Sequence, residues 1–244
     1  MKNYFRTILL TIVLCLYPDI DAKQTIKVST AEDSFIQEVS AAVLIEAYRQ
    51  LSIGVEIVKL PNARSLVTSN IGHTDGEVSR LKGIDKKFNN LIPIPISINF
   101  LQGTVFSNMR NIEILDWKDI HNYIALCVRG IQFVEHYFSL NNIKCNEVTH
   151  QSQAINMLEV GRADLAVLPL LNGLAHIREQ NSKRVKPVSK ALVKVDLFHY
   201  LHKKHTSLVP ALTKVLLEMK KSGQIEAIRN TYILSKMPFA KDYL

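Results

Sequence analysis

The chain has 244 residues, of which 47% are hydrophobic and 21% charged, and its formal net charge at pH 7 is +8. The lysines and arginines are dispersed, and no basic stripe interleaved with aromatic residues is present, so nucleic acid is the least favoured partner. The positive field suits an anionic surface or a small anionic ligand.

The first 22 residues have the pattern of a secretory signal peptide. Lys2 and Arg6 precede an unbroken apolar or hydroxyl run at 7–17, and a short polar tail ends at Ala22. The apolar run is well short of the roughly 20 residues that a membrane-spanning helix needs. Leu14 precedes Cys15, where a bacterial lipoprotein signal has a small residue. We therefore expect cleavage of residues 1–22 and a freely diffusing periplasmic product, from a Gram-negative bacterium, that keeps the charge of +8.

Strand and helix patterns alternate through most of the mature chain, which predicts an α/β protein with mainly parallel strands. Prolines at alternate positions, Pro93 and Pro95, exclude helix, so an extended segment at 96–105 is expected to carry the chain out of a first lobe. In this first part we predict strands at 26–29, 55–59, 76–78 and 91–94, and helices at 33–51 and 63–70.

The second part is predicted to begin at 114–120, which contains the single tryptophan. Its strands are expected at 123–128, 143–148 and 165–168, its helices at 133–140, up to Glu159 and at 172–180, and the chain is extended again at 193–201.

Two closing helices, at 207–222 and 224–232, have no strand of their own and are expected to pack back onto the first lobe. The chain would then cross twice between lobes and form a hinge. The predicted lobes are 23–102 plus 196–244, and 103–195.

One four-residue pattern, Gly-x-x-Asp, occurs twice. An amphipathic stretch runs into Gly72-His73-Thr74-Asp75, another runs into Gly161-Arg162-Ala163-Asp164, and an apolar run follows each. Glycine after the last periodic residue ends a helix in the left-handed conformation. Both phrases therefore predict helix-to-strand junctions, in which Arg162 and Asp164 hold the second junction together. The repeat indicates two similar lobes with a ligand cleft between them.

Two cysteines remain in the mature chain. Cys127 and Cys145 lie in apolar segments separated by a helical pattern, which is a β-α-β arrangement that can place the two strands side by side. An oxidising compartment allows a disulfide. Two buried free thiols are the alternative.

Several phrases in order resemble the family 3 extracellular solute-binding proteins, the periplasmic receptors of amino-acid ABC transporters. The resemblance covers nearly all of the mature chain and implies a type II periplasmic-binding fold, with two Rossmann-like lobes and the ligand in the cleft between them. The phrases are Asp75-Gly76-Glu77-x-x-Arg80, the run 90–96, Trp117-Lys118-Asp119-Ile120, Leu158-Glu159-x-Gly161-Arg162-x-Asp164-Leu165 and Lys203-Lys204-His205-x-x-Leu208.

In the first lobe, the resemblance places Ser79, Arg80 and Lys82 in the stretch that supplies donors to the ligand. Lys87 falls where the family usually has an arginine for the ligand carboxylate, but lysine lacks the bidentate fork. Arg80 can do that work from nearer the strand end, unless Glu77 simply neutralises it.

In the second lobe, the family's Gly-Thr-Thr-Gln turn aligns with Gly130-Ile131-Gln132-Phe133. Only Gly130 and a displaced Gln132 match. The backbone donors at this helix start would still attract an anion, helped by Arg129.

The largest departure concerns the ligand amine. The family places an acidic residue where this chain has Leu168-Pro169-Leu170, and proline cannot bind an ammonium group. Glu32, Asp33 or Glu77 can replace the missing acid. Otherwise the ligand is a carboxylate or another small anion rather than an ordinary α-amino acid.

The chain contains none of the common hydrolase, zinc-protease, phosphate-loop or Cys-x-x-Cys motifs. His199, His202 and His205 recur every third residue, but in an extended segment successive ones lie on opposite faces and would not converge on a metal.

We therefore expect a monomeric, non-enzymatic periplasmic solute-binding protein without cofactor or metal, which delivers a small anionic or zwitterionic, amino-acid-like ligand to an ABC transporter permease. The alternatives are a sensory module for a membrane receptor, or a cyclohexadienyl dehydratase-like enzyme with Glu77 or Glu32 as its acid. The expected ligand residues are Glu77, Ser79, Arg80, Lys87, Arg129, Gly130 and Gln132.

Overall fold

The computed structural model describes residues 24–243, so the predicted signal peptide and Cys15 lie outside the described residues. Within that range, no helix combines the length and the apolar character needed to span a membrane.

In the described part of the chain, nine strands form one mixed sheet, and its two halves repeat the same strand order. In the first half, β2, β1 and β3 are parallel neighbours and β9 lies antiparallel beside β3. In the second half, β6, β5 and β7 are parallel neighbours and β4 lies antiparallel beside β7. The strands are β1 (Thr25–Ala31), β2 (Gly54–Leu60), β3 (Gly76–Leu81), β4 (Leu91–Ser107), β5 (Ala125–Val128), β6 (Asn146–Val148), β7 (Leu165–Pro169), β8 (Lys186–Pro187) and β9 (Val193–His202).

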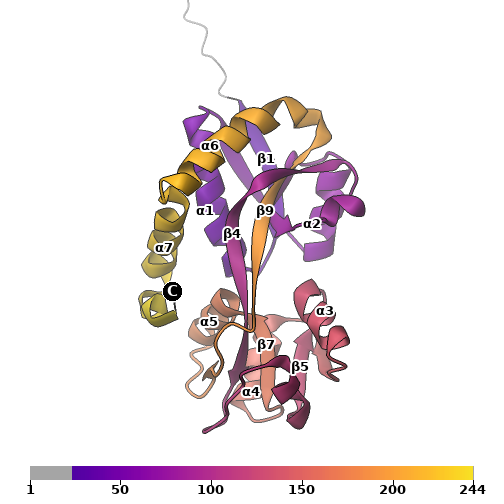
Figure 1. Ribbon diagram of the computed structural model, residues 1–244, viewed down its shortest axis with the longest axis vertical. Helices are drawn as coiled ribbons and strands as arrows, with labels where there is room; N and C mark the ends of the chain where they lie inside the picture. Colours follow the sequence, from indigo (N-terminus) through magenta and orange to yellow (C-terminus); the bar gives the residue numbers. More distant parts are fainter. Residues whose placement is uncertain (1–23, 244) are drawn as a thin grey trace, which may run out of the picture.

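The long strands β4 and β9 join the halves. They pair antiparallel from Leu91 opposite His202 to Gly103 opposite Val193, and both run between the two groups of elements seen in Figure 1. They are the two crossings that the sequence predicted. The strand predicted at 91–94 and the extended segment predicted at 96–105 form one continuous strand, β4. The pairing of β4 with β9 shifts register after Pro93, because proline has no N–H to donate.

Helices cover the sheet at most of the predicted positions, with changes at the ends. The predicted helix at 207–222 begins at Val209, after a 3-10 turn, and has Pro210 in its first turn, where a missing N–H costs nothing. The helices are α1 (Phe35–Gln50), α2 (Asn62–Asn70), α3 (Gln132–Leu140), α4 (Gln151–Glu159), α5 (Leu170–Glu179), α6 (Val209–Lys221) and α7 (Gln224–Lys236), and the 3-10 helices are η1 (Ile84–Lys86), η2 (Trp117–Asn122), η3 (Lys203–Leu208) and η4 (Pro238–Tyr243).

The repeated phrase forms the same junction in both halves. Gly72 has φ 80° after α2, and Gly161 has φ 71° after α4, so both helices end in the left-handed region. The Asp75 Oδ2 atom accepts a hydrogen bond from the Lys27 N–H at 2.7 Å, and the Asp164 Oδ2 atom accepts one from the Ile124 N–H at 2.7 Å. The two helix-to-strand junctions predicted from the sequence are confirmed.

The buried residues form two large hydrophobic clusters. One lies under β1, α1 and α6 and contains Tyr48 and Leu216, and the other surrounds β5, β7 and α3 to α5 and contains Phe106. Phe35 at the start of α1 and Ile233 of α7 belong to the second cluster. The closing helices thus pack on α1, as expected, and α7 also reaches the second half, where Arg178 donates to the Lys236 carbonyl at 2.5 Å. The lobe boundaries at 102/103 and 195/196 stay a prediction.

A disulfide joins Cys127, in β5, to Cys145, directly before β6, with an S–S distance of 2.00 Å. The strands β5 and β6 are parallel neighbours, which brings the two Cα atoms to 5.8 Å. Of the two alternatives that the sequence left open, the structure contains the bridge.

His199 is fully buried at the junction of β9, β3 and α1. Its Nδ1 atom lies 2.7 Å from the Glu77 carbonyl, and its Nε2 atom lies 3.0 Å from the Tyr48 hydroxyl. A carbonyl only accepts, so Nδ1 carries the hydrogen and Nε2 accepts from the tyrosine in the neutral ring. Burial lowers the pKa of His199 from 6.5 to about 4.

The stability of the protein should therefore depend on His199 between pH 6.5 and 4. In this window the unfolded chain binds a proton that the folded chain does not, so the free energy of unfolding falls as the pH falls, by roughly 3 kcal/mol in all. Urea unfolding of the wild type and His199→Gln at pH 7 and pH 4.5 measures the effect. His202, whose pKa is also lowered by burial, is present in both proteins, so the difference between them isolates His199. Equal pH dependence in the two proteins would contradict the assignment.

Candidate functional site

A cavity of about 520 Å³ lies between the two halves, within the size range of small-molecule sites. Its wall is built where parallel strands end and helices begin, so it contains residues from the carboxyl ends of β1, β3, β5 and β7. Backbone N–H groups at helix starts carry partial positive charge and favour a negatively charged group nearby. The starts of five helices, α1 to α5, contribute to the wall. The residues that they contribute include Ser34, Asn62, Gln132, Gln151 and Asn172, in that order.

Arg80 lines the cavity from the end of β3 and is only 8% exposed. Its Nε atom donates to Glu77 Oε2 at 2.7 Å, and its Nη2 atom lies 2.6 Å from the same oxygen. Its Nη1 atom donates to the Asn62 side-chain carbonyl. Residues three apart in a regular strand face opposite sides of the sheet, but the β3–β9 ladder shifts register between Glu77 and Arg80. This irregularity lets the two side chains meet.

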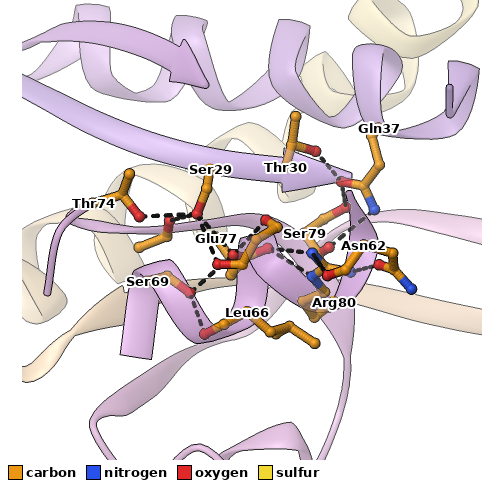
Figure 2. A network of polar contacts seen from close by, with 12 residues as sticks. Ser29, Thr30, Gln37, Asn62, Leu66, Ser69, Thr74, Glu77, Ser79 and Arg80 are labelled. Carbon is orange, nitrogen blue, oxygen red and sulfur yellow. Dashed lines mark hydrogen bonds and ion pairs between the residues drawn. The ribbon is translucent and has the colours of Figure 1, made fainter. Parts of the chain in front are cut away.

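Glu77 lies beneath Arg80 and is 0% exposed. Its Oε1 atom accepts hydrogen bonds from the hydroxyls of Ser29 at 2.8 Å and Ser69 at 2.9 Å (Figure 2). It also accepts one from the Ser65 hydroxyl at 2.7 Å. Both carboxylate oxygens are therefore occupied by protein donors, and Glu77 is not part of the cavity wall. Of the roles considered for Glu77, the geometry shows the ion pair with Arg80, and Glu77 has no direct contact with the cavity.

Ser79 also lines the cavity, and a buried glutamine holds it in place. The Ser79 hydroxyl donates to Gln37 Oε1 at 2.9 Å, while Gln37 Nε2 donates to the Ser79 carbonyl at 3.0 Å. Thr30 donates to the same Gln37 oxygen (Figure 2). Gln37, which the sequence did not single out, thus fixes the backbone beside Arg80.

Lys87 lies away from the cavity wall. It follows the 3-10 helix η1, is exposed, and has its ammonium group 5.8 Å from the centre of the Phe88 ring. The structure does not bring it together with Arg80, so its role as a ligand residue stays a prediction.

The three expected residues of the second half, Arg129, Gly130 and Gln132, all line the cavity. The Arg129 Nε atom donates to Glu147 Oε1 at 2.7 Å, and the arginine side chain is 71% exposed. Gly130 has φ 81°, and its N–H donates to the Glu135 carboxylate at 2.7 Å. Both arginines on the wall are therefore already paired with a glutamate, one buried and one exposed.

Other residues on the wall were missed in the sequence. Asn172 accepts from the Ile36 N–H at 3.0 Å and donates to the Ser34 hydroxyl at 3.3 Å, which ties the start of α5 to the start of α1. Asn62 and Gln151 begin α2 and α4. Asn62 and Gln151 are 89 residues apart, as are the repeated glycines Gly72 and Gly161. The repeat in the sequence could therefore have identified these two residues as a matching pair.

The three histidines at 199, 202 and 205 do not gather. His199 is buried against Tyr48, whereas His205 Nε2 lies 2.7 Å from Asp75 Oδ1. Burial alone would raise the pKa of Asp75, but hydrogen bonds from Lys204, the Lys27 N–H and His205 lower it overall. Among residues 24–243, no group of histidine, cysteine and acidic side chains could hold a metal ion.

Comparison with known proteins gives no match to a protein-family model. An uncharacterized protein of Shewanella oneidensis is 24% identical over 216 residues, which cover 85% of this chain and 81% of that protein.

Solved structures match over most of the chain. A histidine kinase sensor domain with similarity to periplasmic binding proteins has a TM-score of 0.69 at 16% identity, over 86% of this chain and 96% of that one. An ancestral arginine-binding protein bound to arginine has 0.69 at 17%, over 85% and 97%. The probable amino-acid ABC transporter extracellular-binding protein ytmK of Bacillus subtilis has 0.70 at 16%, over 86% and 98%. The predicted α/β fold class, the type II periplasmic-binding-protein fold, is confirmed.

Replacing Glu77 should destabilise the protein strongly. Glu77→Gln removes the charge opposite the buried guanidinium of Arg80, and breaking a buried pair costs about 3–5 kcal/mol. Glu147→Gln is the matched control, because it removes the partner of the other arginine on the wall at an exposed site, where a pair contributes about 0–1 kcal/mol. Urea unfolding at pH 7 measures both. Equal losses of unfolding free energy in the two variants would show that the buried pair of Glu77 with Arg80 does not stabilise the protein more than the exposed pair does.

Proposed function

We propose that this chain is a periplasmic binding protein that captures a small anionic or zwitterionic, amino-acid-like molecule in the cavity between its halves. The observation that carries the proposal is Arg80 on the cavity wall, held by the buried Glu77 and by Asn62. A guanidinium held in this way is ready to meet a carboxylate without losing side-chain freedom when it binds.

The ligand would contact both halves. Arg80 and Ser79 face it from the first, and Arg129, Gly130 and Gln132 from the second, so binding favours closure of the halves about β4 and β9. Export by the predicted signal peptide would place the protein where an ABC transporter permease can receive the ligand.

A sensory role is the second candidate, because the fold also occurs in a histidine kinase sensor domain. The two candidates share the ligand and differ in the membrane partner. Whether the neighbouring genes encode a permease or a receptor kinase distinguishes them.

A dehydratase-like activity receives less support. A general acid must reach the substrate, and the Glu77 carboxylate is enclosed by Arg80 and three serine hydroxyls. Glu32 lies on the wall but is exposed to solvent.

Calorimetric titration with L-amino acids, dicarboxylates and other small anions should find a ligand of about micromolar affinity. Arg80→Lys keeps the charge opposite Glu77 but loses the planar fork, so affinity should fall about tenfold or more. Arg64→Ala is the control, because Arg64 is exposed on α2 and does not line the cavity. Thermal unfolding checks that Arg80→Lys is folded. Unchanged affinity in Arg80→Lys would remove Arg80 from the site, and no binding by the wild type would overturn the proposed function.

A further inference from the structure

We propose that Gln151, the first residue of α4, accepts a hydrogen bond from a nitrogen of the ligand. In the second half of the molecule, this ligand nitrogen would take the place that the Arg80 guanidinium has in the first half. The inference rests on the proposed function and defines the chemistry of the ligand end that meets the second half.

The two halves place four residues in equivalent positions. The helices α2 and α4 have nine residues each, and the separation of 89 residues that relates their glycine ends also relates their first residues, Asn62 and Gln151. The same separation relates Arg80 at the end of β3 to Pro169 at the end of β7. All four residues line the cavity.

The two pairs differ in their hydrogen bonds. In the first half, the side-chain carbonyl of Asn62 accepts from Arg80. In the second half, Pro169 has no donor to offer. The Gln151 Oε1 atom is buried and has no hydrogen-bond partner among residues 24–243. One other side-chain atom of the described chain shares this condition, Thr104 Oγ1, and Thr104 does not line the cavity.

A buried acceptor without a donor is costly, so native proteins rarely keep one without a reason. Gln151 lines the cavity, and when the halves close on a ligand, a ligand N–H that reaches Oε1 would complete its hydrogen bonding. An amide carbonyl would then do the work of the acidic residue that Pro169 and its neighbours do not supply.

The charges on the wall also suit a ligand that carries a positively charged nitrogen. Arg80 and Arg129 are each paired with a glutamate. Glu32 and Asp33 line the same cavity from the loop after β1, and neither carboxylate forms an ion pair within residues 24–243. The wall therefore carries unpaired negative charge that suits an ammonium or guanidinium group.

The test uses L-arginine and L-glutamine as probes, each with analogues that lack one nitrogen-containing group. The 2-oxo acid of each lacks the α-amine, L-norvaline lacks the guanidinium of arginine, and L-glutamate lacks the amide N–H groups of glutamine. Calorimetry compares the wild type with Gln151→Met, which keeps the size but removes the acceptor. Asn156→Met is the control, because Asn156 is exposed on the same helix and does not line the cavity.

For a probe that binds, Gln151→Met should lower the affinity about tenfold and should leave the affinity of the analogue without the contacting nitrogen unchanged. Asn156→Met should bind every probe as the wild type does. Without ligand, Gln151→Met should not lower the thermal unfolding temperature, because it removes a buried acceptor that has no donor.

The outcomes separate the two proposals. Wild-type binding that is insensitive to Gln151→Met, or lost equally for all analogues, overturns the role of Gln151 and leaves the proposed function standing. A large fall in the unfolding temperature would assign Gln151 a structural role and would also overturn the inference. If the wild type binds none of these probes and none of the L-amino acids titrated for the proposed function, the proposed amino-acid-like ligand fails and this inference fails with it.

Discussion

The Glu77 carboxylate is the constraint on which the first half of the molecule depends. A charge without contact with water is tolerated only when nearby groups replace its hydration. Here the replacements come from different elements: Ser29 from β1, Ser65 and Ser69 from α2, and Arg80 from the end of β3 itself. Satisfying one carboxylate therefore fixes α2 against the sheet and aims a guanidinium at the cavity. The same contacts that compensate for burying the Glu77 charge therefore also hold Arg80 in place at the candidate site.

The second half keeps the scaffold without this chemistry. Its helix-to-strand junction repeats the contact between aspartate and backbone, but Ala166 and Pro169 stand at the positions of Glu77 and Arg80. With no carboxylate to bury and no guanidinium to orient, α4 begins with a side-chain acceptor that nothing in the described chain satisfies. In our proposal, the duplicated frame thus offers the ligand a donor, Arg80, from one half and an acceptor, Gln151, from the other. A zwitterion fits this arrangement better than a simple anion does.

Much of the fold could be predicted because its signals are local. Glycine after the last periodic residue marks the ends of α2 and α4, and short apolar runs place most strands. The resemblance to the family 3 solute-binding proteins indicated Ser79, Arg80, Arg129, Gly130 and Gln132, and all five line the cavity. The other two expected residues, Glu77 and Lys87, do not. The burial of Glu77 could not be predicted, since residues three apart in a strand normally face opposite ways and the register shift leaves no mark in the sequence. The lack of a hydrogen-bond partner for Gln151 Oε1 could not be predicted either, because it depends on contacts between distant segments. The continuity of β4 through two prolines depends on its pairing with β9, which is also distant in sequence.

The central claim is that one ligand lies between the two halves and contacts each of them. A crystal structure of the protein grown with the amino acid that binds it most tightly tests this directly. We expect the ligand to occupy the cavity, with a carboxylate within hydrogen-bond distance of Arg80 and a nitrogen within hydrogen-bond distance of Gln151 Oε1. A ligand bound outside the cavity, or one that contacts a single half, would contradict it.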